Sequence, residues 1–216
     1  MKSSEHFGKN LPFLSLVPDK FDHNKKYGIV ILMHGYGASM HDLSGIAPII
    51  NDEDFIYIFP NAPFELNIGL GQKGYAWFPI EEFNVSKSEI LLDNTVNEIL
   101  DMFKNSIDKI YIGGFSQGGM MALNSKFTKS NLFKGAIILS SKSILQNEVK
   151  LDSNTKIFIS HGKEDSIIEI IDGINTNNKL NELGFEVEYH EYNMGHEISV
   201  EVINDLKIWI SKVHKK

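Results

Sequence analysis

A serine set between glycines, at a change in hydrophobic periodicity, constrains this chain most: Gly114-Phe115-Ser116-Gln117-Gly118. Residues 109–113 before it are β-branched and aromatic, as in a buried strand, and residues 117–127 carry apolar side chains at helical spacing. A turn that joins a strand directly to a helix strains its central residue and leaves no room for side chains beside it. The pattern therefore predicts a strand–turn–helix unit that presents Ser116 as a nucleophile, with the Gln117 backbone N–H among the donors that begin the helix.

The rest of the chain repeats this alternation of strands and helices. Apolar runs predict buried strands, and apolar residues at helical spacing predict the helices between them. We expect strands at residues 27–33, 55–59, 109–113, 134–139, 156–160 and 186–192, and helices at 42–50, 88–103 with Ser88 as its cap, 117–127, 173–183 and 199–213. No linker or repeat interrupts the pattern, so residues 1–216 are predicted to form a single α/β domain with a mostly parallel sheet and helices on both faces.

Charge and cysteine content argue against several kinds of function. The chain has 28 acidic and 21 basic residues, and every basic residue is lysine, so the guanidinium groups that read phosphates and guanine edges are absent. We therefore expect no nucleic-acid partner. The absence of cysteine excludes disulfides and thiolate chemistry and suits a cytoplasmic location. The apolar run at residues 11–17 is short and broken by polar and proline residues, so no integral membrane segment is expected.

A serine nucleophile needs a base and a carboxylate, and α/β-hydrolases place them after the serine in the order acid, then histidine, on loops that follow strands. His196 follows the last predicted strand and is the expected base. Glu164 and Asp165 are adjacent carboxylates after the preceding strand, and the spacing favours Asp165. The Tyr36 N–H lies in a glycine-rich loop after the first predicted strand, and we expect it to share an oxyanion hole with the Gln117 N–H.

Two further histidines and a glycine-rich stretch could suggest a catalytic, metal or cofactor site, but we interpret them as structural. His34 and His161 each end a predicted central strand directly before a glycine, and we expect them to hold their loops by hydrogen bonds. Neither belongs to an i,i+4 histidine pair or an H-E-x-x-H pattern, so no metal site is predicted. Residues 69–74 match G-x-G-x-x-G but follow no predicted strand and open no helix, so no cofactor is predicted.

Residues 64–85 form a long apolar connection without regular periodicity, which is unusual in a compact domain. Such loops are often functional, and we expect Leu70, Trp77 and Phe78 to line a groove for the substrate. The alternative is a satellite hydrophobic cluster that packs over the sheet.

Four motifs follow one another in an order typical of a known family: HGYGAS, PNAP with Ala76-Trp77-Phe78 after it, GFSQGG around Ser116, and the pair HGKED and MGHEI. Over residues 27–213 the chain resembles the phospholipase/carboxylesterase family of α/β-hydrolases, which includes bacterial carboxylesterases and acyl-protein thioesterases. The resemblance implies an α/β-hydrolase fold without a separate cap domain, no cofactor, and an acyl ester or thioester substrate. It also supports Asp165 as the acid.

The sequence thus predicts a serine carboxylesterase that works through an acyl-enzyme. His196 takes the proton of Ser116, the serine oxygen attacks the acyl carbonyl, and water then releases the acid. Two alternatives are a catalytically idle binding protein with the same fold and an acyltransferase that uses an acceptor other than water. The acyl chain, the leaving group and the oligomeric state are left open.

Overall fold

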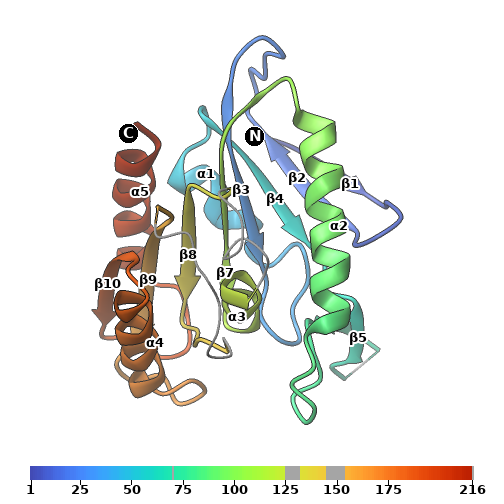
Figure 1. The fold of residues 1–216 in the computed structure, drawn as a ribbon. Coiled ribbons are helices and arrows are strands. Elements are labelled where there is room, and N and C mark those ends of the chain that lie inside the picture. The colour runs from blue at the N-terminus through green and yellow to red at the C-terminus, as the bar shows by residue number, and fades with distance from the viewer. Residues whose placement is uncertain (70, 125–131, 145–153, 216) are drawn as a thin grey trace.

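The computed structural model describes residues 1–69, 71–124, 132–144 and 154–215. Within these ranges one large sheet runs through the molecule (Figure 1). In spatial order its strands are β1 (Lys2–His6), β2 (Phe13–Val17), β4 (Phe55–Pro60), β3 (Tyr27–Met33), β7 (Ile107–Phe115), β8 (Gly135–Leu139), β9 (Lys156–Gly162) and β10 (Glu186–Tyr192). Neighbours from β4 to β10 are parallel, and β1 and β2 are antiparallel additions at one edge. The predicted mostly parallel sheet is confirmed.

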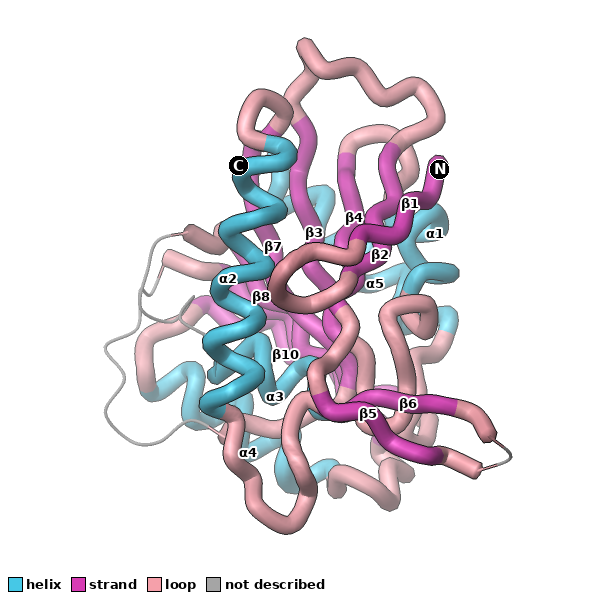
Figure 2. The backbone as a smooth tube through the Cα atoms, turned by 90° about the vertical axis from the view of Figure 1, so that its right-hand side faces the viewer, coloured by secondary structure: helices cyan, strands magenta, loops and turns pink. Residues whose placement is uncertain are grey.

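Helices cover both faces of this sheet, which is why its central strands are apolar throughout. The helices are α1 (Ala47–Ile50), α2 (Ser86–Phe103), α3 (Gln117–Asn124), α4 (Ile170–Glu182) and α5 (Val200–Lys215). All seven residues of β3 are buried, and alternate ones face opposite sides. Ile29 and Ile31 belong to one hydrophobic cluster with side chains of α2, α3 and α4, whereas Val30 and Leu32 belong to a second cluster with side chains of α1 and α5. Figure 2 shows α2 in front of the sheet and α1 and α5 behind it.

Three predicted helices begin differently in the structure, and the one expected at 173–183 begins three residues earlier, at Ile170 of α4. The helix expected at residues 42–50 is a short 3-10 turn, η1 (Ser44–Ile46), followed by the single turn α1. Ser88 does not cap α2, because the helix begins two residues earlier and the Ser88 hydroxyl donates to the Trp77 carbonyl. The helix expected at 117–127 is described as far as Asn124, and residues 125–127 lie outside the described residues.

Three antiparallel pairings were not predicted: β1 with β2, β2 with β4, and β5 (Phe64–Asn67) with β6 (Lys73–Ala76). Strand β1 is polar and mostly exposed, so its sequence carries no hydrophobic alternation that would reveal a strand. Strands β5 and β6 pair within the segment expected to be irregular. A bridge between Ala38 and Tyr75 attaches this hairpin to the loop after β3.

The strands β3, β7, β8 and β9 are parallel, so their carboxyl ends lie along the same edge of the sheet. The loops that follow these strands meet at this edge. In open α/β sheets this is the edge where ligands bind. None of the helices in the described ranges has the length and apolar character needed to cross a membrane. A single domain over residues 1–216 stays a prediction.

Candidate active site

Ser116 lies on the turn between β7 and α3, which we call the nucleophile turn (residues 114–118), with φ of 54° in the left-handed region. The flanking glycines explain how the turn closes. A Cβ added at Gly118 would lie 2.1 Å from the Met33 carbonyl oxygen, and one at Gly114 would lie 2.5 Å from the same atom. The Ser116 N–H also donates to the Leu139 carbonyl at 3.0 Å. Backbone packing therefore fixes the position of this serine.

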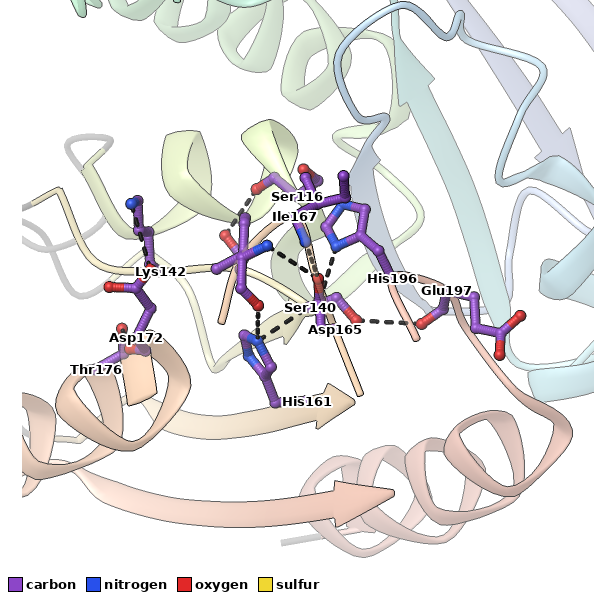
Figure 3. Close-up of polar contacts among 12 residues, drawn as sticks. Ser116, Ser140, Lys142, His161, Asp165, Ile167, Asp172, Thr176, His196 and Glu197 are labelled. Atoms are coloured by element: carbon purple, nitrogen blue, oxygen red, sulfur yellow. Dashed lines mark hydrogen bonds and ion pairs between the residues drawn. The ribbon is translucent and has the colours of Figure 1, made fainter. Parts of the chain in front are cut away.

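His196 and Asp165 are joined by a hydrogen bond of 2.7 Å between Nδ1 and Oδ2 (Figure 3). The other carboxylate oxygen of Asp165 accepts the backbone N–H groups of Ile167 and Ile168, each at 2.9 Å. The Asp165 side chain is fully buried, and the His196 side chain is 17% exposed. An ionised carboxylate only accepts hydrogen bonds, so Nδ1 carries a ring proton, and in the neutral imidazole the lone pair lies on Nε2.

The environment of Asp165 keeps it ionised. Burial alone raises the pKa of this carboxyl, but the hydrogen bonds from His196 and from the Ile168 and Ile167 N–H groups outweigh burial and hold the pKa below its usual value. The neighbouring Glu164 is exposed to solvent. Of the two adjacent carboxylates, Asp165 is the one that the structure brings to His196.

His196, the predicted base, lies against the nucleophile turn. The imidazole of His196 packs on the ring of Phe115, with centroids 4.7 Å apart. Figure 3 shows His196 between Asp165 and the turn that carries Ser116. The structure thus collects the three predicted triad residues from three different loops at one edge of the sheet.

The loop after β3 meets the nucleophile turn at Gly35, where an added Cβ would lie 3.4 Å from the Ser116 Cβ. Further along this loop the Gly37 N–H donates to a carbonyl of β6. Gln117 is the first residue of α3, so its N–H has no acceptor within the helix. Tyr36 and Gln117, the expected oxyanion donors, therefore belong to the two segments that meet at Ser116.

A buried hydrogen-bond network supports the loop after β3. His34 donates from Nδ1 to the Gly35 carbonyl at 2.7 Å and accepts the Ala62 N–H at Nε2 at 3.1 Å. The Trp77 indole N–H donates to the His34 carbonyl at 2.9 Å. Burial lowers the pKa of His34 to about 4, only partly opposed by its bond to Gly35, so the ring is neutral at pH 7. His34 holds its loop by hydrogen bonds, as predicted.

The structure contradicts the groove prediction for Trp77 and Phe78. Their exposed fractions are 0% and 1%, and both belong to the hydrophobic core. The side chain of Gln117 fixes this segment beneath the nucleophile turn, because its amide accepts the Trp77 N–H and donates to the Phe78 carbonyl, each at 3.0 Å. The packing alternative is therefore correct for these two residues. Leu70, the third residue of the expected groove, lies outside the described residues.

His161 also holds a loop, the acid loop (residues 163–169). Its buried Nε2 donates to the Ile168 carbonyl at 2.8 Å and lies 3.6 Å from Asp165 Oδ2. By holding Ile168, His161 supports the backbone that donates to the carboxylate of Asp165. The structural role expected for His161 is confirmed.

Sequence reasoning missed Ser140 and Ser141, which directly follow β8. The Ser141 hydroxyl donates to the Ser116 carbonyl at 2.7 Å, and the Ser140 hydroxyl donates to the Glu197 carbonyl at 3.1 Å. Their position just past a parallel strand, at the edge where such sheets collect functional residues, was the available signal.

In the described part of the chain, no three His, Asp or Glu side chains are grouped so that they could hold a metal ion. Of the glycine-rich stretch at residues 69–74, Lys73 and Gly74 belong to β6, and Gly69 and Gly71, which lie between β5 and β6, have φ of 96° and 75°. These glycines therefore serve the turn of a hairpin rather than the start of a helix.

The sheet, the strained turn at Ser116 and the Asp165–His196 pair define an α/β-hydrolase. A family model described as Phospholipase/Carboxylesterase matches residues 21–214, and the chain belongs to this family. The resemblance and the fold class predicted from the sequence are confirmed, and the protein is a hydrolase.

Relatives with similar sequences and structures agree with this assignment. The acyl-protein thioesterase 1 of Debaryomyces hansenii is 31% identical over 212 residues, which cover 87% of this chain and 91% of that protein. The crystal structure of a carboxylesterase from Mesorhizobium loti has a TM-score of 0.82 at 17% identity and covers 97% of this chain and 98% of its own. That of Zea mays acyl-protein thioesterase 2 has a TM-score of 0.76 at 20% identity, covering 94% and 98%. At these identities the two structures show the fold alone.

Proposed function

We propose that this protein is a serine carboxylesterase that hydrolyses carboxylic esters or thioesters through an acyl-enzyme intermediate. The observation that carries the proposal is the 2.7 Å bond between Asp165 and His196 beside the strained turn of Ser116. Serine, acid and histidine follow one another along the chain in the order used by α/β-hydrolases.

In the acylation step His196 Nε2 takes the proton of Ser116 while Oγ bonds to the acyl carbonyl carbon. The carbonyl oxygen becomes an oxyanion, which the backbone N–H groups of Tyr36 and Gln117 stabilise. The bond to the alkoxy or thiol leaving group then breaks. His196 returns its proton to the leaving oxygen or sulfur, and the acyl group stays on Ser116.

Deacylation repeats these steps with water in place of the serine hydroxyl. His196 takes a proton from water, the resulting oxygen attacks the acyl carbon, and the bond to Ser116 Oγ breaks. The proton returns to Ser116 and the carboxylic acid leaves. Asp165 holds the tautomer of His196 and stabilises its protonated form in both steps, which its lowered pKa and full burial favour.

The substrate is proposed to be a small-molecule or lipid-like acyl compound. Similarity to an acyl-protein thioesterase at 31% identity supports thioesters alongside esters. With Trp77 and Phe78 in the core, we propose that an acyl chain beside the site contacts exposed apolar side chains such as those of Tyr36 and Ile167, which are 47% and 71% exposed. A cytoplasmic location is proposed as well, supported by the absence of cysteine from the sequence.

The proposal is tested with esters and thioesters of graded acyl length and with Ser116→Ala. We expect the wild type to hydrolyse part of this panel and the variant to lose about 10⁶-fold in kcat. Ser160→Ala is the matched control, because Ser160 is a buried serine at the same sheet edge whose hydroxyl has no hydrogen-bond partner. An inactive wild type, or a variant as active as the wild type, would overturn the proposal. Acyl transfer to an added alcohol in preference to water would instead indicate an acyltransferase.

A further inference from the structure

We propose that Ser140 and Ser141 are positioning residues that hold the nucleophile turn and the base loop (residues 193–199) in one geometry. The inference rests on the proposed function, because it concerns the alignment of Ser116 with His196. Neither serine belongs to the proposed triad, yet each is fully buried at the end of β8 and donates to one of the two loops.

Ser141 contacts the nucleophile turn. Its hydroxyl donates to the Ser116 carbonyl at 2.7 Å. It also packs tightly against the first turn of α3, since a Cβ added at Gly119 would lie 2.6 Å from the Ser141 Cβ. The carbonyl of Leu139, two residues earlier, accepts the Ser116 N–H at 3.0 Å. Both backbone polar groups of the proposed nucleophile are therefore bound to the end of β8.

Ser140 contacts the base loop. Its hydroxyl donates to the carbonyl of Glu197, the residue after His196, at 3.1 Å (Figure 3). Its backbone N–H donates to the Ser160 carbonyl of β9 at 2.9 Å. The two adjacent serines thus bind segments that reach the site from different strands.

The backbone of Ser140 is strained, with φ of 44° in the region that favours glycine. Such a conformation persists in a non-glycine residue only where its surroundings fix it, and these outliers concentrate at functional sites. Glycine would adopt this backbone more easily but would lack the hydroxyl that binds Glu197. The hydroxyl is therefore the feature that distinguishes serine from glycine at this position.

The consequence for catalysis follows from geometry. Proton transfer requires Ser116 Oγ and His196 Nε2 to meet at hydrogen-bond distance, and these atoms lie on separate loops. A misplacement of about 1 Å can cost about 100-fold in rate. By binding both loops to one strand end, Ser140 and Ser141 set the relative position of the two groups.

The experiment compares Ser140→Ala, Ser140→Gly, Ser141→Ala and the double variant Ser140→Ala/Ser141→Ala with the wild type. The control is again Ser160→Ala, which removes a buried hydroxyl without a hydrogen-bond partner at the same sheet edge. We measure thermal unfolding, and kcat and KM on an activated ester well below the unfolding temperature. Reaction of the wild type with a fluorophosphonate, read by peptide mass, first establishes whether Ser116 is the nucleophile.

We expect each alanine variant to lose about 10- to 100-fold in kcat, with KM within about threefold because substrate contacts are untouched. The double variant should lose less than the product of the two single losses, since both bonds serve one alignment. Ser140→Gly should unfold at a higher temperature than Ser140→Ala, because glycine relieves the strained φ, yet be as slow. The control should keep its kcat.

A merely structural role predicts a different result, in which the variants unfold earlier but keep the wild-type kcat. That outcome, with Ser116 labelled in the wild type, would overturn the inference and leave the proposed function intact. Full activity in Ser140→Gly would overturn it for Ser140. Should Ser141→Ala fail to fold, Ser141→Cys keeps a weak donor of similar size and is expected to fold with reduced kcat. A wild type not labelled at Ser116 would count against the proposed function itself.

Discussion

The nucleophile turn lies beside the acid–base pair, Asp165 and His196, yet the two are held in place by different kinds of contact. Around Ser116 close backbone packing dominates, with a Cβ at Gly118 excluded by the Met33 carbonyl at 2.1 Å, and the Ser141 hydroxyl adds one side-chain bond to the Ser116 carbonyl. His196 is instead held through its side chain by Asp165, at 2.7 Å. Asp165 in turn depends on two N–H groups of a loop.

This difference in how the two regions are held matches the two tasks proposed for them. A nucleophile and its oxyanion donors must not move as charge develops, and close backbone packing provides that rigidity. A base must accept and return protons, and a partly exposed imidazole with one free nitrogen can do so. Changes on the acid–base side should therefore damage rate without damaging the fold, whereas changes on the nucleophile side should damage both.

On the acid–base side the largest effect is expected from Asp165→Asn, which keeps the shape of the side chain and removes its charge. We expect kcat to fall about 10⁴-fold, equivalent to about 5 kcal/mol, because the amide no longer fixes the tautomer or stabilises protonated His196. Single-turnover rates on an activated ester measure this loss. Glu164→Gln is the matched control, since Glu164 is exposed, and should stay within about tenfold of the wild type. The reverse ranking of the two variants would remove Asp165 from the triad.

The second effect concerns the backbone packing that holds the nucleophile turn. Gly118→Ala should cost about 4 kcal/mol of unfolding free energy, because the new methyl group meets the Met33 and His34 carbonyl oxygens and the turn cannot open without moving β3. Urea unfolding checks this value. The control is Gly45→Ala, where an added Cβ has no atom within 4 Å and stability should change by less than about 1 kcal/mol. Equal stability of the two variants would mean that backbone packing does not hold the turn.

The third effect is a pH dependence that arises from His34. Its pKa is about 4 in the folded protein, against an ordinary value of about 6.5, because burial disfavours the charged ring. Its stabilising contribution is therefore fully present above pH 6.5 and is lost as the pH falls towards 4, by up to about 3 kcal/mol. Burial also lowers the pKa values of His6 and His214, which add to the wild-type slope.

The measurement is therefore a comparison of the wild type with His34→Gln. Unfolding free energy is followed between pH 7 and 4, and the variant should be less stable at pH 7 but show a flatter dependence on pH. Parallel curves for the two proteins would mean that His34 is not held neutral in the folded state.

The smallest effect is expected from Trp77→Phe, which removes the indole donor to the His34 carbonyl. Leaving this buried carbonyl unpaired should cost about 1–2 kcal/mol beyond the loss of packing. Trp209→Phe provides the comparison, because Trp209 is equally buried but packs on the opposite face of the sheet. If the two substitutions cost the same in urea unfolding, the bond to His34 contributes nothing measurable.

The sequence predicted the parallel core well because the signals there are local. The strands Tyr27–Met33 and Glu186–Tyr192 begin and end where predicted, since a buried strand needs a continuous or alternating apolar run. The strand Lys2–His6 was missed because it is polar and depends on pairing with β2. Edge strands of this kind owe their conformation to tertiary contacts, which a local pattern does not contain.

In the candidate site, too, features with a local sequence pattern could be predicted, whereas features that depend on tertiary contacts could not. The strained turn at Ser116 could be predicted because it requires glycines at fixed positions. The role of Trp77 was misjudged because an apolar side chain in an irregular segment looks the same whether it lines a groove or joins the core. Ser140 was missed because the bond that gives it a role reaches a carbonyl 57 residues away in the sequence.

The most direct test of the account is the reaction of a fluorophosphonate with the wild type and with Asp165→Asn, followed by intact mass and peptide mapping. We predict one adduct per chain at Ser116 in both proteins, formed at least about 10³-fold more slowly in the variant. The backbone would then place the nucleophile, and the acid–base pair would set only its reactivity. An unmodified wild type, or an adduct on another residue, would contradict the account.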